Sequence, residues 1–151
     1  MGQVTQQEMI MVGALGIRFL VEAGDSNGSV SVFECFVPAE ARMPAPHRHN
    51  GFEETIYGLE GVTTFTIDGE TVEIGPGEAR CVARGQVHAF ANDGASDARF
   101  LAVATPGVFG RAYFEDVGAV LATSAGGPPD LDAIGAVMRR HGLTPAAPSL
   151  D

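Results

Sequence analysis

Short apolar segments alternate with turn residues over the first two thirds of the chain. The segments are rich in Val, Ile, Phe, Thr and Tyr, the residue types that favour strands. Turn signals interrupt them at residues 75–77 and 92–94, and the Asp68-Gly69 pair predicts a hairpin turn. Many short strands at this spacing predict an all-β sandwich or barrel, with its core at about residues 28–106.

The last third of the chain has apolar residues at helical spacing instead. Residues 111–123 and residues 130–141 each place four apolar side chains on one stripe. Asp130 stands where it can cap the second predicted helix, and Gly142 follows directly after that helix. We therefore expect a C-terminal helical segment at about residues 111–142, which packs outside the barrel or at a subunit contact.

The composition is that of one globular domain covering residues 1–151. Hydrophobic residues make up 45% of the 151 residues and charged residues 19%, which suits a single sizeable core. The formal net charge is -10 at pH 7. Nucleic acid and anionic membrane surfaces would repel such a chain, so we expect neither as a partner. A small-molecule ligand or substrate is expected instead.

The absence of lysine and the spacing of the cysteines exclude further kinds of functional site. All nine basic residues are arginines, so neither a lysine Schiff base nor a P-loop can form. Cys35 and Cys81 are not spaced as a zinc or redox pair, and each stands in an apolar stretch, so we expect both to be buried. No secretory signal and no membrane-spanning run is recognisable, which predicts a cytoplasmic protein.

Three of the four histidines lie in two patterned segments. His47 and His49 are two residues apart, so on a strand their side chains point to the same face. Glu54 follows five residues later, and the Asn-Gly pair between them can turn the chain so that the carboxylate returns to that face. With His88 from a later strand, this set suits one divalent metal ion. A His-x-His pair alone, however, is more often two ordinary polar residues.

The longer pattern resembles the two sequence motifs of the cupin superfamily. The first motif is carried, at the family's spacing, by His47, His49, Glu54 and Gly61. The second motif is carried by Gly77, Gly85, His88 and Asn92. Because several fixed spacings agree at once, the match is specific, and it spans residues 41–92.

Two positions depart from the family pattern. Ala41 stands where the first motif has glycine, and Ala83 where the second has proline. Neither position is a ligand in the family, so the departures bear on the local turns more than on the metal. The spacing also selects Glu54 over Glu53, which we expect to point away, and we interpret Asn92 as structural.

The resemblance implies a cupin, or jelly-roll, β-barrel with one divalent metal ion in its mouth. The implied ligands are His47, His49, Glu54 and His88, and the ion is Fe, Mn, Ni, Co, Cu or Zn. Small cupins with this ligand set resemble quercetin dioxygenase-like oxidoreductases. Such an ion favours an enolate or catecholate ligand, and Glu54 is the candidate catalytic base. Candidate apolar walls of the substrate pocket are Met43, Phe52, Ile56 and Phe90.

Three functional alternatives stay open at this point. The leading hypothesis is a metal-dependent, dioxygenase-type enzyme acting on a small hydroxylated or enolisable compound. The second is a non-catalytic cupin that binds or senses a small molecule, and the third, a storage-type structural barrel, fits poorly with four retained ligands. Exposed barrel edges and amphipathic helices also predict a homodimer.

Overall fold

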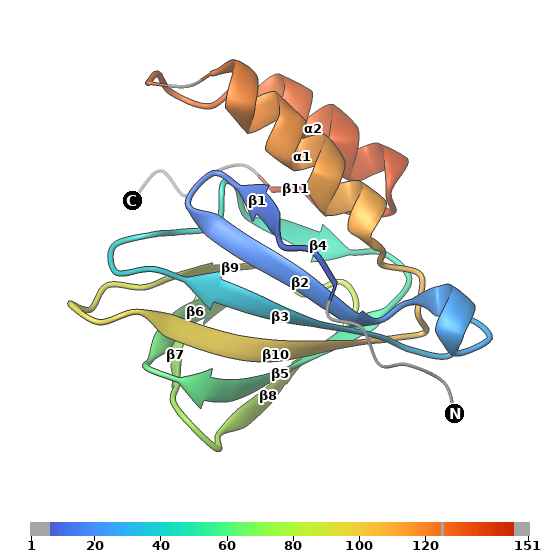
Figure 1. Cartoon of the computed structure of the whole chain (residues 1–151), viewed down its shortest axis with the longest axis horizontal. Coiled ribbons are helices and arrows are strands. Elements are labelled where there is room, and N and C mark those ends of the chain that lie inside the picture. Colours follow the sequence, from blue (N-terminus) through green and yellow to red (C-terminus); the bar gives the residue numbers. More distant parts are fainter. Residues whose placement is uncertain (1–6, 125, 147–151) are drawn as a thin grey trace.

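The computed structural model describes residues 7–124 and 126–146, which form two antiparallel sheets and a pair of helices (Figure 1). The six-stranded sheet has the order β1-β2-β3-β10-β5-β8. Its strands are β1 (Ile10–Val12), β2 (Leu15–Val21), β3 (Ser31–Val37), β10 (Ala98–Thr105), β5 (Glu53–Glu60) and β8 (Ala79–Val82). A short 3-10 helix, Ala23–Asp25, follows β2.

The five-stranded sheet has the order β11-β4-β9-β6-β7. Its strands are β11 (Leu143–Pro145), β4 (His47–His49), β9 (His88–Ala91), β6 (Thr63–Ile67) and β7 (Glu70–Ile74). The predicted Asp68-Gly69 turn joins β6 to β7, and both residues have positive φ angles, 47° and 82°. That backbone matches the twist of the hairpin it closes.

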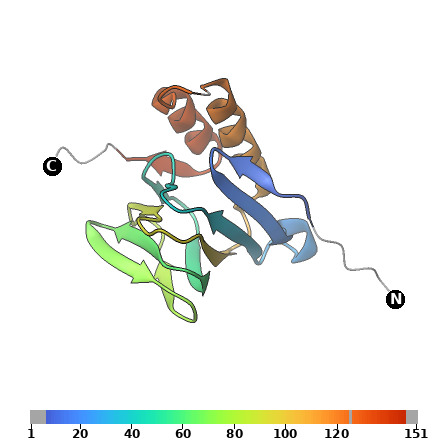
Figure 2. The ribbon, with the colours of Figure 1, turned by 60° about the vertical axis from the view of Figure 1, so that its left-hand side comes forward.

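The hydrophobic core fills the space between the two sheets. On β3, residues alternate between buried and half-buried, so Phe33, Cys35 and Val37 all point inward. Phe65 on β6 and Phe100 on β10 face each other from opposite sheets, with ring centroids 5.4 Å apart. The predicted all-β architecture, two sheets around one core, is therefore confirmed, and Figure 2 shows it in a view turned by 60° from Figure 1.

The strands extend beyond the predicted core of residues 28–106. β1 and β2 precede that range, and β11 follows the helices and pairs with β4. β1 and β11 have three residues each, which is too short to show an alternating pattern. Each is a strand because it pairs with the neighbouring strand at the edge of a sheet.

The two helices lie outside the sheets, as predicted. α1 (Arg111–Thr123) packs against β1, and α2 (Leu131–Arg140) packs against β11. Asp130 caps α2, since its side chain accepts a hydrogen bond of 3.0 Å from the backbone N–H of Ala133. Within the described ranges, neither helix is long and apolar enough to span a membrane.

One expectation about the cysteines is wrong. Cys35 is buried, but Cys81 is exposed to solvent. Cys81 lies on β8, an edge strand of the six-stranded sheet. Its neighbour Val82 points into the core, so the alternation of the strand turns Cys81 outward although the local sequence is apolar.

Candidate metal centre

His47, His49 and His88 meet inside the barrel at the junction of β4 and β9. His47 and His49 occupy the two ends of β4 and share its buried face, while Arg48 between them is exposed. His88 begins β9 directly opposite His47 in the ladder. All three imidazoles are buried, at 5%, 1% and 3% exposure. The two-residue spacing in the sequence thus produces the shared face it predicts.

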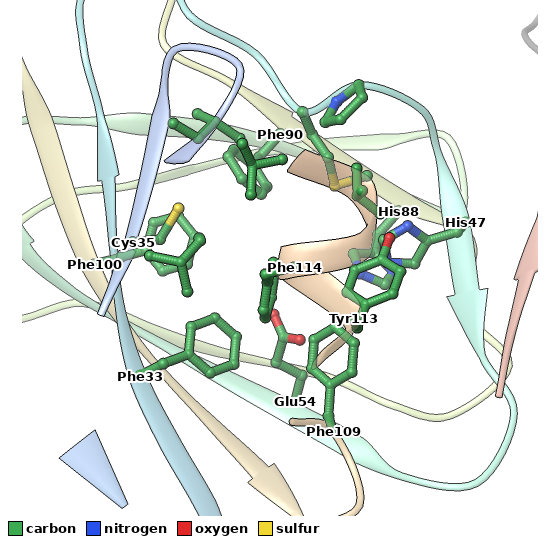
Figure 3. A pocket seen from close by; sticks show the side chains of 16 residues that line it. Phe33, Cys35, His47, Glu54, His88, Phe90, Phe100, Phe109, Tyr113 and Phe114 are labelled. Carbon is green, nitrogen blue, oxygen red and sulfur yellow. The ribbon is translucent and has the colours of Figure 1, made fainter. Parts of the chain in front are cut away.

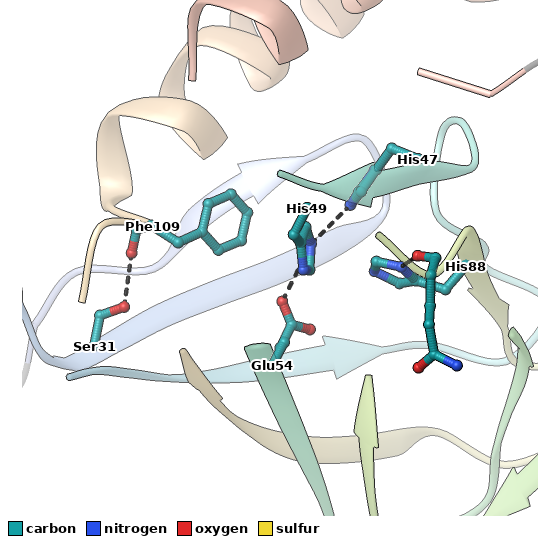
Figure 4. Close-up of polar contacts among 7 residues, drawn as sticks. Ser31, His47, His49, Glu54, His88 and Phe109 are labelled. Carbon is teal, nitrogen blue, oxygen red and sulfur yellow. Dashed lines mark hydrogen bonds and ion pairs between the residues drawn. The ribbon is translucent and has the colours of Figure 1, made fainter. Parts of the chain in front are cut away.

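The imidazole nitrogens are close enough to share one ion. Nε2 of His47 and Nε2 of His49 are 3.2 Å apart (Figure 4). One nitrogen from each of the three histidines can be chosen so that all lie within 4.8 Å of one another. Two nitrogens that each lie about 2.0–2.1 Å from one zinc-like ion are themselves roughly 3 Å apart. The His47–His49 distance fits that requirement.

A backbone hydrogen bond leaves a free nitrogen on His88. Nδ1 of His88 lies 3.1 Å from the carbonyl oxygen of Gln86. A carbonyl only accepts, so Nδ1 carries the proton and Nε2 keeps its lone pair. A backbone carbonyl that accepts the proton of the other ring nitrogen, and so fixes the tautomer, is usual for a metal-binding histidine.

Burial keeps the three histidines neutral. Burial and, to a smaller extent, the nearby His88 lower the pKa of His49 to about 3. Burial is also the main reason why the pKa of His47 lies well below its usual range and why that of His88 is lowered. Neutral imidazole is the form that binds a metal. The donor set therefore fits a divalent ion.

Glu54 approaches the histidines from the other sheet. It lies near the start of β5, and the bend at residues 50–52 separates that strand from β4. Oε2 of Glu54 is 3.6 Å from Nε2 of His49, and burial raises the pKa of the carboxyl to about 8. Among the described residues, the tight cluster contains the three histidines without Glu54. The carboxylate therefore stands beside the three nitrogens, facing the cavity.

Glu53 points to the opposite side of β5, as expected. Its carboxylate accepts two side-chain hydrogen bonds from Arg84, at 2.6 and 2.7 Å. These bonds are the main reason why the pKa of Glu53 falls to about 2. Glu53 therefore ties β5 to the loop after β8, while Glu54 faces inward.

The motif residues that are not ligands shape the backbone. A Cβ on Gly61, which has φ +62°, would lie 2.4 Å from the carbonyl oxygen of Asp97. The amide of Asn92 donates to the carbonyls of Val37 and Ser96, at 2.9 and 2.8 Å. These contacts agree with the structural role expected for Asn92.

Ala41 and Ala83 fit their turns without strain. The residue with positive φ beside Ala41 is Glu40, at 69°. Beside Ala83 the positive φ falls on Gly85, at 84°. Neither alanine has the left-handed backbone that would require glycine.

A narrow cavity of about 50 Å³ leads from the histidines into the apolar interior (Figure 3). His47, His88 and Glu54 line its polar end. Of the four predicted wall residues, Met43 and Phe90 line the cavity. The other two, Phe52 and Ile56, are fully buried but are not among the described lining residues.

Phe52 has a different place from the one we predicted. Its ring stacks on the His49 imidazole, with centroids 4.2 Å apart and planes 16° apart. It therefore packs against the histidine cluster and is not among the described residues that line the cavity. Ile56 points into the core from β5, in register with Ala102 of β10.

Much of the cavity wall was not predicted from the sequence. Phe109 comes from the connection between β10 and α1, and the hydroxyl of Ser31 donates a 2.8 Å hydrogen bond to its carbonyl (Figure 4). Tyr113 and Phe114 come from the first turn of α1. The available signal was an aromatic group directly before and within an amphipathic helix, but that pattern does not show which cavity the helix covers.

The remaining histidine, His141, lies outside the cluster. Its Nε2 is 2.8 Å from a carboxylate oxygen of Asp116 on α1, and its ring is 5.7 Å from that of Tyr113. We expected a surface histidine at a helix C-terminus. It does cap the end of α2, but it also connects the two helices.

Comparison with known proteins identifies the class. A family model described as a cupin domain matches residues 32–104. The polyketide cyclase RemF from Streptomyces resistomycificus is 31% identical, with a TM-score of 0.56 over 68% of this chain and 73% of that one. The chain belongs to the cupin superfamily.

Two further solved structures share the fold. A predicted oxalate decarboxylase from Thermotoga maritima is 24% identical, with a TM-score of 0.61 over 69% of this chain and 94% of that one. A sugar phosphate isomerase of the cupin superfamily from Silicibacter pomeroyi is 25% identical, with a TM-score of 0.50 over 59% of each chain. The comparison with curated proteins found no match.

Proposed function

We propose that this cupin is a metal-dependent enzyme of dioxygenase type, acting on a small hydroxylated or enolisable compound. One observation carries the proposal: three buried, neutral imidazoles and one carboxylate converge at the end of an apolar cavity. When bound there, a divalent ion lowers the pKa of a hydroxyl or enol group that it contacts. The chain's own residues would accept the proton and hold the substrate.

Glu54 is the proposed proton acceptor. Its Oε2 lies 3.6 Å from the His49 nitrogen that faces the cluster, and the side chain also lines the cavity. A hydroxyl group held beside the histidines is therefore within reach of this carboxylate. Such a positioned base contributes typically about 10²–10⁴-fold to a rate.

The cavity wall favours a substrate with an apolar, aromatic body. Phe33, Phe100, Phe109 and Phe114 are among the side chains that surround it. No Lys or Arg is among the described lining residues. A dianion or a phosphate group would therefore depend on the metal ion alone for a positive partner, because no described lining side chain supplies one.

A cyclisation of an enolisable compound is the second candidate reaction. The 31% identity to the polyketide cyclase favours it, and it uses the same substrate class without consuming oxygen. Both reactions begin when a proton leaves the substrate for Glu54. Oxygen consumption distinguishes them.

The test uses metal-loaded protein and a panel of catechols, flavonols and β-diketones. Oxygen uptake and product formation are measured for the wild type, Glu54→Gln and Glu53→Gln. We expect turnover by the wild type and by Glu53→Gln, and a loss of at least about 10²-fold in Glu54→Gln. Product without oxygen uptake would favour the cyclase. Ligand binding with no turnover of any compound would contradict an enzymatic role and support a binding or sensing cupin.

A further inference from the structure

Tyr113 brings a hydroxyl group from α1 to the polar end of the cavity. The side chain is 5% exposed and lines the cavity with His47, His88 and Glu54. Its ring lies 6.4 Å from the His47 ring and nearly perpendicular to it, at 78°. In Figure 3 the oxygen is at the end of the ring nearest His47. Apart from the histidines and Glu54, the wall around it is almost entirely apolar.

No hydrogen bond within residues 7–124 and 126–146 involves the hydroxyl, and its oxygen is not one of the fully buried polar atoms that lack a partner. The oxygen therefore keeps some accessible surface. A phenol can both donate and accept a hydrogen bond. Because the side chain lines the cavity, a ligand bound there can pair with it.

Neighbouring rings hold the phenol in place. Phe109 and Phe114 pack against it, with ring centroids 5.0 and 5.1 Å away. On the other side the ring of His141 lies 5.7 Å away, and His141 is itself fixed by its 2.8 Å contact with Asp116. The orientation of the hydroxyl is thus set by both helices before any ligand enters. Such preorganisation suits a group that selects or orients a ligand.

We propose that Tyr113 is a substrate-binding residue, whose hydroxyl donates a hydrogen bond to the substrate oxygen that faces the three histidines. This inference rests on the proposed function, because it takes the histidine end of the cavity as the reacting end. The phenol and Glu54 then each contact a different oxygen of the substrate. The phenol donates to one oxygen, and the carboxylate accepts the proton of another. Compounds with two adjacent oxygens are therefore bound best.

The test measures catechol binding to cobalt-loaded protein by titration of the visible absorption of Co²⁺. Tyr113→Phe removes only the hydroxyl, and Tyr57→Phe is the matched control, because Tyr57 is the other tyrosine of the chain and is 42% exposed on β5. We expect the Kd for catechol to rise about 10-fold in Tyr113→Phe, the effect of one lost hydrogen bond. Tyr57→Phe should match the wild type. Without catechol, cobalt content, spectrum and melting temperature should be the same in all three proteins.

The outcomes separate this inference from the proposed function. Equal Kd values in the wild type and Tyr113→Phe would overturn the role of Tyr113 and leave the metal-dependent function standing. A Tyr113→Phe protein that loses cobalt or melts at lower temperature would assign the hydroxyl a structural role, and that also overturns the inference. A wild type that binds neither cobalt nor catechol would remove the proposed function itself.

Discussion

Nε2 of His47 and Nε2 of His49 lie 3.2 Å apart in the closed interior of the barrel. Both belong to a three-residue strand, so their separation is set by the pleat of the backbone. Burial holds both imidazoles in the neutral form. Two lone-pair donors at this spacing, with His88 opposite, are the geometry that a metal ion could use.

Removal of the metal should destabilise the protein. The ion binds the folded site and has no preformed site in the unfolded chain, so saturation at 100 times Kd adds about 2.7 kcal/mol. For a chain of this size that corresponds to a melting temperature roughly 5–10 °C lower after chelation. Calorimetry before chelation, after it and after metal is restored checks this. An unchanged melting temperature despite complete metal loss would count against the site.

The two adjacent glutamates should behave differently. Glu54→Gln removes the inward carboxylate and should lower turnover at least about 10²-fold. The protein should stay folded, because glutamine fills nearly the same buried volume. Glu53→Gln weakens the exposed pair with Arg84, which contributes little to stability because it is screened by solvent, and should leave turnover intact. Initial rates and urea unfolding measure both effects. Equal rates for the two variants would show that Glu54 has no special role.

Asn92→Ala should be strongly destabilising. It leaves the carbonyls of Val37 and Ser96 without their donor and removes the acceptor for the N–H of Gly94, 3.0 Å away. Buried groups that lose partners cost about 1–3 kcal/mol each, so we expect a total of roughly 2–4 kcal/mol. Asn50→Ala is the control, since Asn50 is exposed and only accepts from Thr144. Similar unfolding curves for the two variants would refute the structural role of Asn92.

Gly61→Ala should also cost stability, for a steric reason. Alanine would need a positive φ and would bring its Cβ to 2.4 Å from the carbonyl oxygen of Asp97. The unfavourable positive φ and the steric clash together should lower the free energy of unfolding by about 3 kcal/mol. Gly51→Ala meets nothing within 4 Å and should be near neutral. Urea titrations of both variants make the comparison, and a stable Gly61→Ala protein would contradict the assigned backbone constraint.

The shared buried face of His47 and His49 was predictable from the sequence because its geometry is local. A spacing of two residues fixes the shared face of His47 and His49, and the motif register chooses Glu54 over Glu53. The predicted helices also match α1 and α2 closely, because capping and apolar periodicity are properties of the segment itself. In each case the evidence lies within a few residues of the side chain concerned.

The cavity wall was less predictable, because it depends on how distant elements pack. Whether Phe52 lines the cavity or packs on the far side of His49 depends on the direction of the bend at residues 50–52. The place of Tyr113 over the cavity depends on how α1 packs against β1. The exposure of Cys81 depends on which face of β8 the core covers. None of these relations leaves a periodic signal in the sequence.

The most direct test of the account is the metal content of protein purified without chelator. Elemental analysis should find about one divalent ion per chain in the wild type. We expect almost none in His47→Ala, His49→Ala or His88→Ala, and an undiminished content in His141→Ala, which removes the one histidine outside the cluster. A wild type that contains no metal and cannot be loaded would contradict the account. So would full metal content in each of the three single variants of His47, His49 and His88.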